Sequence, residues 1–411
     1  MNADGHSAAQ AAPAPPPRAP AAAPLSTIRS NLRAARLDRR EIAGSLGDLG
    51  TFLPLLVGMS AKNGLDFAAG LFFAGFFSVV TGLLFAVPMA VQPMKAIAAV
   101  ALTEGLTAPQ IVAAGAIVSA VVLTLGLTGL IETLNRLIPR SLVRGLQLAL
   151  GLSLAIKGVQ MVAAANTPLG PDGYAVAIAA AAVVLALSNS HRLPPALLLF
   201  AAGVAVALWR APDRAALTLW LPSLSPPAMA DFAAAFWKAA VPQIPLTTLN
   251  SVVAVCVLSM DLFPDRPIGV RRVATSVGLM NLVGCWFGAM PMCHGAGGMA
   301  GQHRFGARTN GSILFLGVAK MALAVLFGAS LMSACAAFPA GILGVMLAFS
   351  GLELALVARD QTGRAEAFIT LATAGACLAL NNMALGFAVG AAIIVWMRLI
   401  RRVTGGESPV A

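Results

Sequence analysis

Apolar blocks of about 20 residues fill most of this chain, and that length is what an α-helix needs to cross a bilayer. Only 10% of the 411 residues are charged and 58% are apolar, whereas a soluble domain carries about 25% charged residues. Lipid offers no partner for backbone polar groups, so such blocks form helices. The sequence therefore predicts an all-α polytopic membrane protein surrounded by a lipid bilayer.

Fourteen membrane elements are expected, seven in each half of the chain. In the first half they cover 42–60, 66–87, 94–104, 109–134, 142–164, 174–188 and 194–209. In the second half they cover 243–260, 269–289, 295–302, 311–333, 336–357, 365–380 and 383–400. The third and tenth elements are too short for a complete span. We expect these two to be half-helices preceded by extended segments.

Five segments follow from this division. The N-terminus, 1–40, is Ala- and Pro-rich with a basic end, and is expected to be disordered and cytoplasmic. The two sets of seven elements occupy 41–209 and 241–402. A polar connection and an amphipathic surface helix (230–240) cover 210–240, and a short cytoplasmic tail covers 403–411.

Basic residues predict the orientation of the elements. The net charge of +11 does not indicate nucleic acid here, because the Lys and Arg residues lie in short gaps between apolar blocks. With the N-terminus inside, the cytoplasmic gaps hold Arg136, Arg140, Arg144, Arg192, Arg266, Arg271, Arg272, Arg304, Arg308, Arg359, Arg364, Arg398, Arg401 and Arg402. The opposite side holds Lys62, Arg210, Arg214 and Lys238. We expect both termini in the cytoplasm and, by default, a bacterial inner membrane.

An odd number of elements in each half inverts the second half relative to the first. The broken segments Pro88–Lys95 and Pro291–Gly298 then enter from opposite faces and meet inside the membrane. Proline fixes φ and removes a backbone donor, so each segment should be extended before its half-helix. A helix N-terminus carries unpaired N–H groups and about half a positive charge. Two such ends predict a midplane site for an anion.

Polar residues around the two breaks are the candidate ligands. Gln92 and His294 each offer a donor and an acceptor, and Lys95 offers charge in the first turn of a half-helix. The eighth element is also polar where a lipid-facing helix would not be. The candidate substrate-binding residues are Gln92, Pro93, Met94, Lys95, Gln243, Thr247, Thr248, Asn250, His294, Gly295, Ala296 and Gly297.

Acidic residues inside apolar elements are candidates for coupling or gating, because a charge in the membrane is costly. They are Asp48 in the first element and Glu353 towards the cytoplasmic end of the twelfth. Lys157 and Lys320 are expected to form helix contacts or line an aqueous path. The five cysteines show no metal or disulfide spacing. We expect no metal and no other cofactor, and no nucleotide-binding loop is present.

Several motifs resemble those of a known family, the molybdate transporter branch of the sulfate-permease superfamily. They are Gly47–Thr51, Pro88–Lys95, Gln243–Ser251, Pro291–Gly298 and Gln302–Arg308. The resemblance implies a seven-plus-seven inverted repeat with a core and a gate domain that move in an elevator-like or rocking mechanism. It also implies an oxyanion held between the third and tenth elements, flanked by the first and eighth. The cytoplasmic regulatory domain of typical sulfate permeases is not expected.

The sequence thus predicts a secondary transporter, not an enzyme, that imports molybdate. A proton is the coupling ion that we consider, and a homodimer the assembly. The nearest alternative is a transporter of sulfate or another tetrahedral oxyanion, because the same helix ends would bind it. An anion channel is the alternative of another class. An intramembrane hydrolase using His294 is disfavoured, because no Ser or carboxylate partner stands beside it in sequence.

Overall fold

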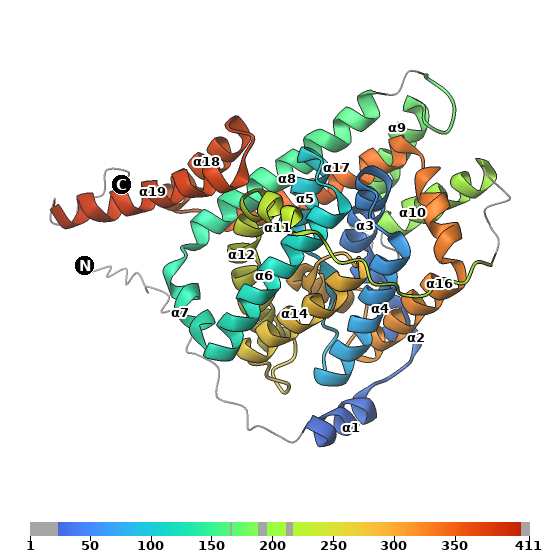
Figure 1. The fold of residues 1–411 in the computed structure, drawn as a ribbon, viewed down its shortest axis with the longest axis horizontal. Coiled ribbons are helices and arrows are strands. Elements are labelled where there is room, and N and C mark those ends of the chain that lie inside the picture. Colours follow the sequence, from blue (N-terminus) through green and yellow to red (C-terminus); the bar gives the residue numbers. More distant parts are fainter. Residues whose placement is uncertain (1–23, 165–166, 188–194, 211–216, 404–411) are drawn as a thin grey trace, which may run out of the picture.

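The computed structural model describes residues 24–164, 167–187, 195–210 and 217–403 (Figure 1). The predicted disordered segment up to residue 23 and the tail from 404 lie outside the described residues, as do Arg192 and Arg214. The helices of the first half are α1 (Pro24–Ala34), α2 (Arg39–Ser45), α3 (Leu49–Asn63), α4 (Phe67–Leu84), α5 (Lys95–Glu104), α6 (Ala108–Thr128), α7 (Leu130–Leu137), α8 (Arg140–Ala163), α9 (Tyr174–Leu187) and α10 (Pro195–Arg210). A 3-10 turn, Leu46–Asp48, joins α2 to α3, and strand β1 (Val91–Pro93) precedes α5.

The second half repeats this order of elements. Its helices are α11 (Met229–Ala235), α12 (Val241–Leu246), α13 (Ala254–Leu262), α14 (Val270–Gly284), α15 (Ala296–Arg304), α16 (Gly311–Ala336), α17 (Ala340–Leu356), α18 (Arg364–Ala379) and α19 (Met383–Val403). Strand β2 (Met292–His294) precedes α15 as β1 precedes α5. Among the described residues, seven helices are long and apolar enough to cross a membrane, or eight if the bent pair α2–α3 is one span. The predicted polytopic helical fold is confirmed.

Local signals in the sequence explain where these helices begin and end. Asp66 caps α4 by accepting hydrogen bonds from the N–H groups of Ala68 and Ala69. Thr107 and Gln110 form a capping box at the start of α6. Gly105 ends α5 with a φ of +73°, a conformation that glycine adopts without strain. Gly105 therefore sets where the half-helix α5 ends.

Two segments differ from the expected division. Residues 24–34, expected within a disordered N-terminus, form α1, which is fixed to α4 by the Asn31 amide that donates to the Leu83 carbonyl at 2.9 Å. The expected surface helix over 230–240 is not separate from the eighth element. Helix Met229–Leu262 runs through both, with π-helical turns at Phe236–Ala240 and Thr247–Val253. The apolar residues Met229 and Trp237 on its first part are exposed.

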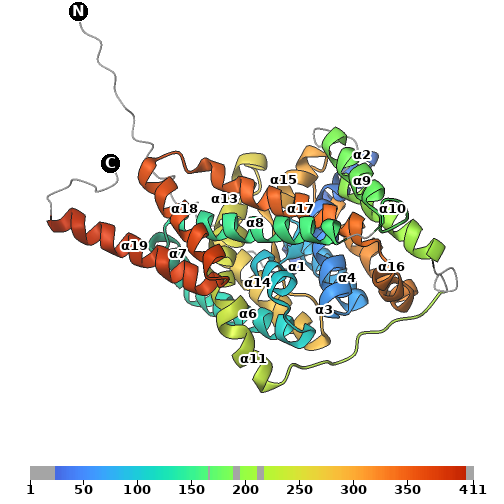
Figure 2. The ribbon, with the colours of Figure 1, turned by 90° about the horizontal axis from the view of Figure 1, so that it is seen from above.

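Corresponding elements of the two halves pack against each other in a reciprocal pattern. Helix α4, the second element of its half, packs on α16, the fourth of the other half, while α6 packs on α14. The fifth elements, α8 and α17, pack on each other and lie side by side in Figures 1 and 2. A two-fold relation between the halves predicts this pattern.

The helices form two groups that meet at α3 and α5. Helices α2 to α6 and α12 to α16, which we call the core group, pack mainly among themselves. Helices α8 to α10 and α17 to α19, which we call the gate group, do the same. The groups meet where α5 contacts α8 and where α3 contacts α10 and α17.

Glycine permits the close approach of α8 and α17. A Cβ atom on Gly151 would lie 2.5 Å from the carbonyl oxygen of Gly351, and one on Gly344 would lie 2.7 Å from that of Gly158. These glycines are seven residues apart on each helix, so they lie on one face and form a continuous seam. The gate group thus depends on backbone-to-backbone packing.

We expect Gly151→Ala to lower the thermal stability of the protein in detergent. Overpacking a tight contact costs about 1–3 kcal/mol, and this backbone contact has no flexible side chain that can move aside. Gly375→Ala in α18 is the matched control, because a Cβ atom there meets nothing within 4 Å and alanine favours a helix. The measurement is the unfolding temperature of both variants. Equal temperatures would contradict the seam.

Candidate functional site

The two broken segments meet as a pair of antiparallel strands. Gln92 of β1 lies opposite Cys293 of β2, flanked by the pairs Val91–His294 and Pro93–Met292. The ladder continues at both ends. The N–H of Met94 donates to the Pro291 carbonyl at 2.9 Å, and the N–H of Gly295 donates to the Ala90 carbonyl at 3.3 Å. The extended backbone that the prolines predicted is confirmed, and each strand supplies the backbone partners that the other lacks.

Side chains alternate between the two faces of this strand pair. Gln92 and Cys293 share one face and line a cavity. His294 lies on the other face with Val91. On that side, Asn281 of α14 holds β2 in place. Its amide nitrogen donates to the Met292 carbonyl and its amide oxygen accepts from the Met292 N–H, each at 2.5 Å.

The N-terminus of α5 is already capped by a side chain. The amide oxygen of Gln243 accepts hydrogen bonds from the N–H groups of Ala96 and Ile97, at 2.8 and 3.3 Å. The amide nitrogen of Gln243 donates to the Thr247 hydroxyl at 2.8 Å. Two of the unpaired N–H groups of this helix end are therefore satisfied within the protein.

The N-terminus of α15 is open by comparison. Its N-cap residue is Gly295, and no side chain among the described residues accepts from the first turn. The Gln92 side chain lies against this turn. A Cβ atom on Gly298 would lie 2.6 Å from the Gln92 amide nitrogen, and one on Gly295 would overlap the amide oxygen. Glycine at these two positions makes the room that Gln92 occupies.

Gln92 has no hydrogen-bond partner for either amide atom within the described part of the chain, although the residue is 0% exposed. A buried, unsatisfied amide is costly, so it points to a functional role. Lys95 lies close by, because a Cβ atom on Gly297 would be 4.0 Å from its ammonium nitrogen. An amide, an ammonium and an open helix N-terminus thus converge.

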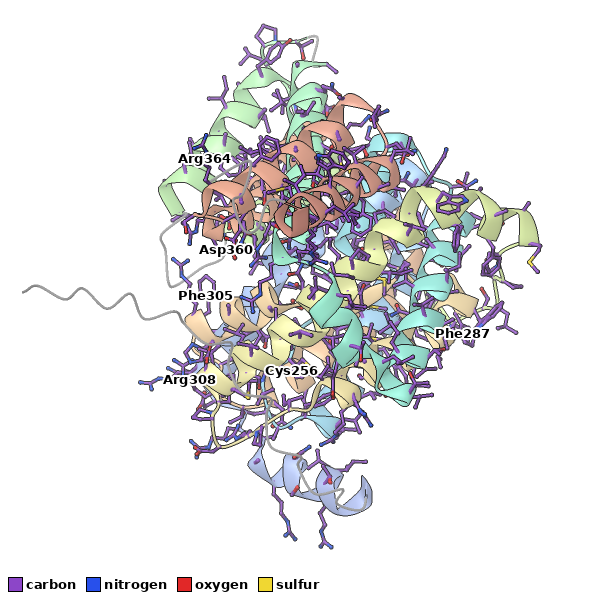
Figure 3. All side chains as sticks on the ribbon, turned by 90° about the vertical axis from the view of Figure 1, so that its left-hand side faces the viewer. Cys256, Phe287, Phe305, Arg308, Asp360 and Arg364 are labelled. Atoms are coloured by element: carbon purple, nitrogen blue, oxygen red, sulfur yellow. The ribbon has the colours of Figure 1, made fainter. Side chains whose placement is uncertain are left out.

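A cavity of about 650 Å³ contains this convergence and lies between the core and gate groups. The gate group contributes the polar residues Arg144, Gln147, Ser350 and Glu353. The cavity also reaches Arg304 and Phe305. In Figure 3, Phe305, Arg308, Asp360 and Arg364 lie along one edge of the molecule and Phe287 lies at the opposite edge. The cavity therefore extends towards the edge that the basic residues predict to be cytoplasmic.

The structure brings together eight of the predicted site residues and places six elsewhere. Those that line the cavity are Gln92, Lys95, Gln243, Asn250, Gly295, Ala296, Gly297 and Glu353. Pro93 is the last residue of strand β1 and Met94 is the N-cap of α5, and both are buried. The hydroxyl of Thr247 accepts from Gln243, whereas that of Thr248 donates to the Ile244 and Pro245 carbonyls of its own helix. Neither threonine lines the cavity.

His294 was predicted as a ligand and is not placed as one. Its Nε2 lies 3.0 Å from the Ser276 hydroxyl and its Nδ1 lies 3.4 Å from the Ala90 carbonyl, so both ring nitrogens have protein partners. The strand pair instead turns Cys293 towards the cavity, and a one-residue step in a strand reverses the face. Cys293 and Ser251 are lining residues that the sequence analysis missed.

Asp48 is also outside the cavity, in a buried ion pair. Its carboxylate lies 3.2 Å from the Lys320 ammonium of α16, with side-chain exposures of 1% and 3%. The ammonium also lies 3.8 Å from the centre of the Phe52 ring. This pair joins the first element to the eleventh. A contact between helices was one of the two roles expected for Lys320. Among the described residues, no cluster of three or more His, Cys, Asp or Glu is arranged to hold a metal.

A helical membrane protein with paired broken helices at a central cavity belongs to the class of solute transporters. The comparisons with known proteins agree. The model of the family described as "Molybdate transporter of MFS superfamily" matches residues 40–154 and 235–354, one segment in each half. This chain belongs to the molybdate transporter family.

Curated relatives extend the match over nearly the whole chain. Molybdate transporter 2 of Arabidopsis thaliana is 39% identical, over 90% of this chain and 90% of the relative. Molybdate transporter 1 of Chlamydomonas reinhardtii is 35% identical, over 87% and 91%. The family and these relatives are transporters and not enzymes.

Solved structures with the same fold include those of two anion transporters. The transmembrane domain of a cyanobacterial bicarbonate transporter, BicA, superposes with a TM-score of 0.67 at 16% identity, covering 86% of this chain and 97% of that one. The murine anion transporter Slc26a9, in its inward-facing state, gives 0.67 at 12% identity, covering 91% and 71%. At these identities the likeness concerns the fold alone, and it confirms the expected fold class.

We expect Lys320→Met to lower the stability of the protein strongly. It would leave the Asp48 carboxylate buried without a counter-charge, which costs about 3–5 kcal/mol. The double variant Asp48→Asn with Lys320→Met should recover much of this loss. Arg271→Gln, which breaks the exposed pair between Arg271 and Glu132, is the matched control and should change little. Unfolding temperatures in detergent measure all three, and a double variant no more stable than Lys320→Met would contradict the pairing.

Proposed function

We propose that this chain imports molybdate by secondary active transport, with the oxyanion bound in the central cavity. The observation that carries the proposal is the buried Gln92 amide, unpartnered and directed at the open N-terminus of α15 beside the Lys95 ammonium. Unpaired N–H groups, about half a positive charge and a full positive charge favour an anionic ligand. The molybdate transporters among the relatives support molybdate as that anion.

The proposed site is less symmetric than two opposed helix ends. Gln243 caps α5, so its N-terminus contributes positive potential while two of its N–H groups are already bonded. The N–H groups of Ala296 and Gly297 at α15 are the ones free to bind oxygen atoms directly. Gln92 and Lys95 then supply the donors on the other side. We therefore assign direct contact to α15 and an electrostatic role to α5.

The location of the cavity between two helix groups fits an alternating-access transporter. The core group carries the helix ends, and the gate group contributes Arg144, Ser350 and Glu353 from the facing side. Movement of one group against the other would expose the site to each side of the membrane in turn. The cavity extends towards the predicted cytoplasmic edge, which corresponds to release into the cell. In this proposal both termini are cytoplasmic and the membrane is the bacterial inner membrane.

Sulfate transport is the second candidate, since sulfate has the same charge and tetrahedral shape. The helix ends and Lys95 do not distinguish the two anions by charge. An anion channel is the candidate of another class, and it predicts flux without exchange across the membrane. Uptake of labelled molybdate into proteoliposomes, with sulfate as competitor and molybdate inside for trans-stimulation, separates the three. Trans-stimulation with weak competition by sulfate is the expected result.

Gln92→Ala should raise the apparent KM for molybdate about tenfold or more. It removes a buried donor to a charged ligand, and such hydrogen bonds contribute about 1.5–3 kcal/mol. Gln160→Ala, an exposed glutamine on α8, is the matched control and should transport as the unaltered protein does. An unchanged KM in Gln92→Ala, with folded protein by size-exclusion chromatography, would remove Gln92 from the site and leave molybdate transport itself standing.

Proton coupling, if it acts through a carboxylate in the cavity, involves Glu353. This side chain lines the cavity, whereas Asp48 is paired with Lys320. We expect Glu353→Gln to abolish the stimulation of molybdate uptake by an imposed proton gradient while uptake without a gradient persists, because glutamine cannot release a proton. Glu366→Gln on α18 is the control. Full stimulation in Glu353→Gln would exclude Glu353, and an uncoupler without effect on the unaltered protein would exclude proton coupling.

A further inference from the structure

A thiol stands opposite the unpartnered amide in the central cavity. Cys293 pairs with Gln92 across the two strands and lines the same cavity. The Ser251 hydroxyl of the eighth element donates a hydrogen bond to the Cys293 sulfur at 3.0 Å. The sulfur also lies 3.9 Å from the Pro93 carbonyl. The position of the thiol is therefore set by a buried hydroxyl and by the neighbouring strand.

The two halves place different chemistry at equivalent positions. Helix α5 begins at Lys95 and α15 at Ala296, so Gln92 and Cys293 each stand three residues before a half-helix. One repeat presents an amide, which is a strong hydrogen-bond donor and acceptor, and the other presents a thiol, which is a weak one. The Ser251 hydroxyl, which is a strong donor, is already directed at the sulfur. The part of the cavity wall beside Gln92 is thus polarisable at Cys293, whose side chain adds only a weak donor.

We propose that Cys293 contacts the transported oxyanion and determines its specificity, with Ser251 as a positioning residue. This inference rests on the proposed transport of molybdate. The cost of taking an ion out of water rises as its radius falls, so sulfate loses more hydration than the larger molybdate of equal charge. Strong donors are needed to offset that loss. A thiol at this position in the wall offers only a weak one, and its soft surface suits the larger ion.

A serine at this position should favour sulfate. Cys293→Ser replaces the thiol with a hydroxyl that donates a full hydrogen bond and occupies less volume. The smaller sulfate should gain more from this added donor than molybdate does, and we expect a change of about three- to tenfold in relative affinity. We therefore expect the sulfate concentration that halves molybdate uptake to fall about three- to tenfold in this variant. Cys256→Ser, a buried cysteine of α13 that does not line the cavity, should keep the original value.

The ratio of sulfate to molybdate affinity separates a specificity role from packing. If the thiol only fills space, Cys293→Ser and Cys293→Ala would change the stability or the maximal rate of the protein and leave this ratio unchanged. An unchanged ratio in transporting Cys293→Ser would overturn the inference while the proposed function stands. Absence of molybdate uptake by the unaltered protein would overturn the proposed function, and the inference with it.

A second measurement needs no transport by the variant. A small methanethiosulfonate reagent forms a mixed disulfide with the Cys293 sulfur and releases sulfinate. Molybdate should protect the unaltered protein from this modification at lower concentration than sulfate does, and Cys293→Ser should lack the protected label. Modification at the same rate with and without saturating molybdate would place the sulfur outside the site and overturn the inference.

Discussion

Backbone hydrogen bonds between β1 and β2 are the interaction on which the centre of this protein depends. Non-helical backbone inside a bilayer is tolerated only where its polar groups find partners in the protein. The two proline-containing segments are each short of partners alone, and together they form a ladder from Ala90–Gly295 to Met94–Pro291. This pairing ties the two halves of the chain at one point. It also fixes where both half-helices begin.

The same ladder decides which side chains reach the cavity. Alternation along the strands turns Gln92 and Cys293 to the cavity and His294 towards Ser276 and α14. Glycine at 295 and 298 lets the Gln92 amide approach the first turn of α15. A larger residue at either position would displace it. The arrangement of a buried amide, an ammonium and a helix end therefore follows from two strands of three residues each.

Much of this architecture could be predicted from the sequence, because membrane elements are set by local signals. The length of apolar blocks, the position of prolines and the gaps with arginine indicated most helices of the membrane region within a few residues, as well as the extended segments. The separate helix α7 and the start of the eighth element at Met229 were not predicted. Contacts between distant segments could not be predicted in the same way. The pairing of Asp48 with Lys320 and the capping of α5 by Gln243 depend on three-dimensional packing. Which face Cys293 and His294 occupy depends on the strand register, which the sequence alone does not show.

Repetition of the backbone with divergence of the side chains gives this centre its asymmetry. Each half contributes a strand, a helix start and a first element beside it, so a symmetric protein would present two equal helix ends. Here Gln243 closes one end, and no equivalent side chain among the described residues closes the other. With one capped end and one open end, the N–H groups that remain free lie on the α15 side only, which is the side to which we assign direct contact with the proposed oxyanion.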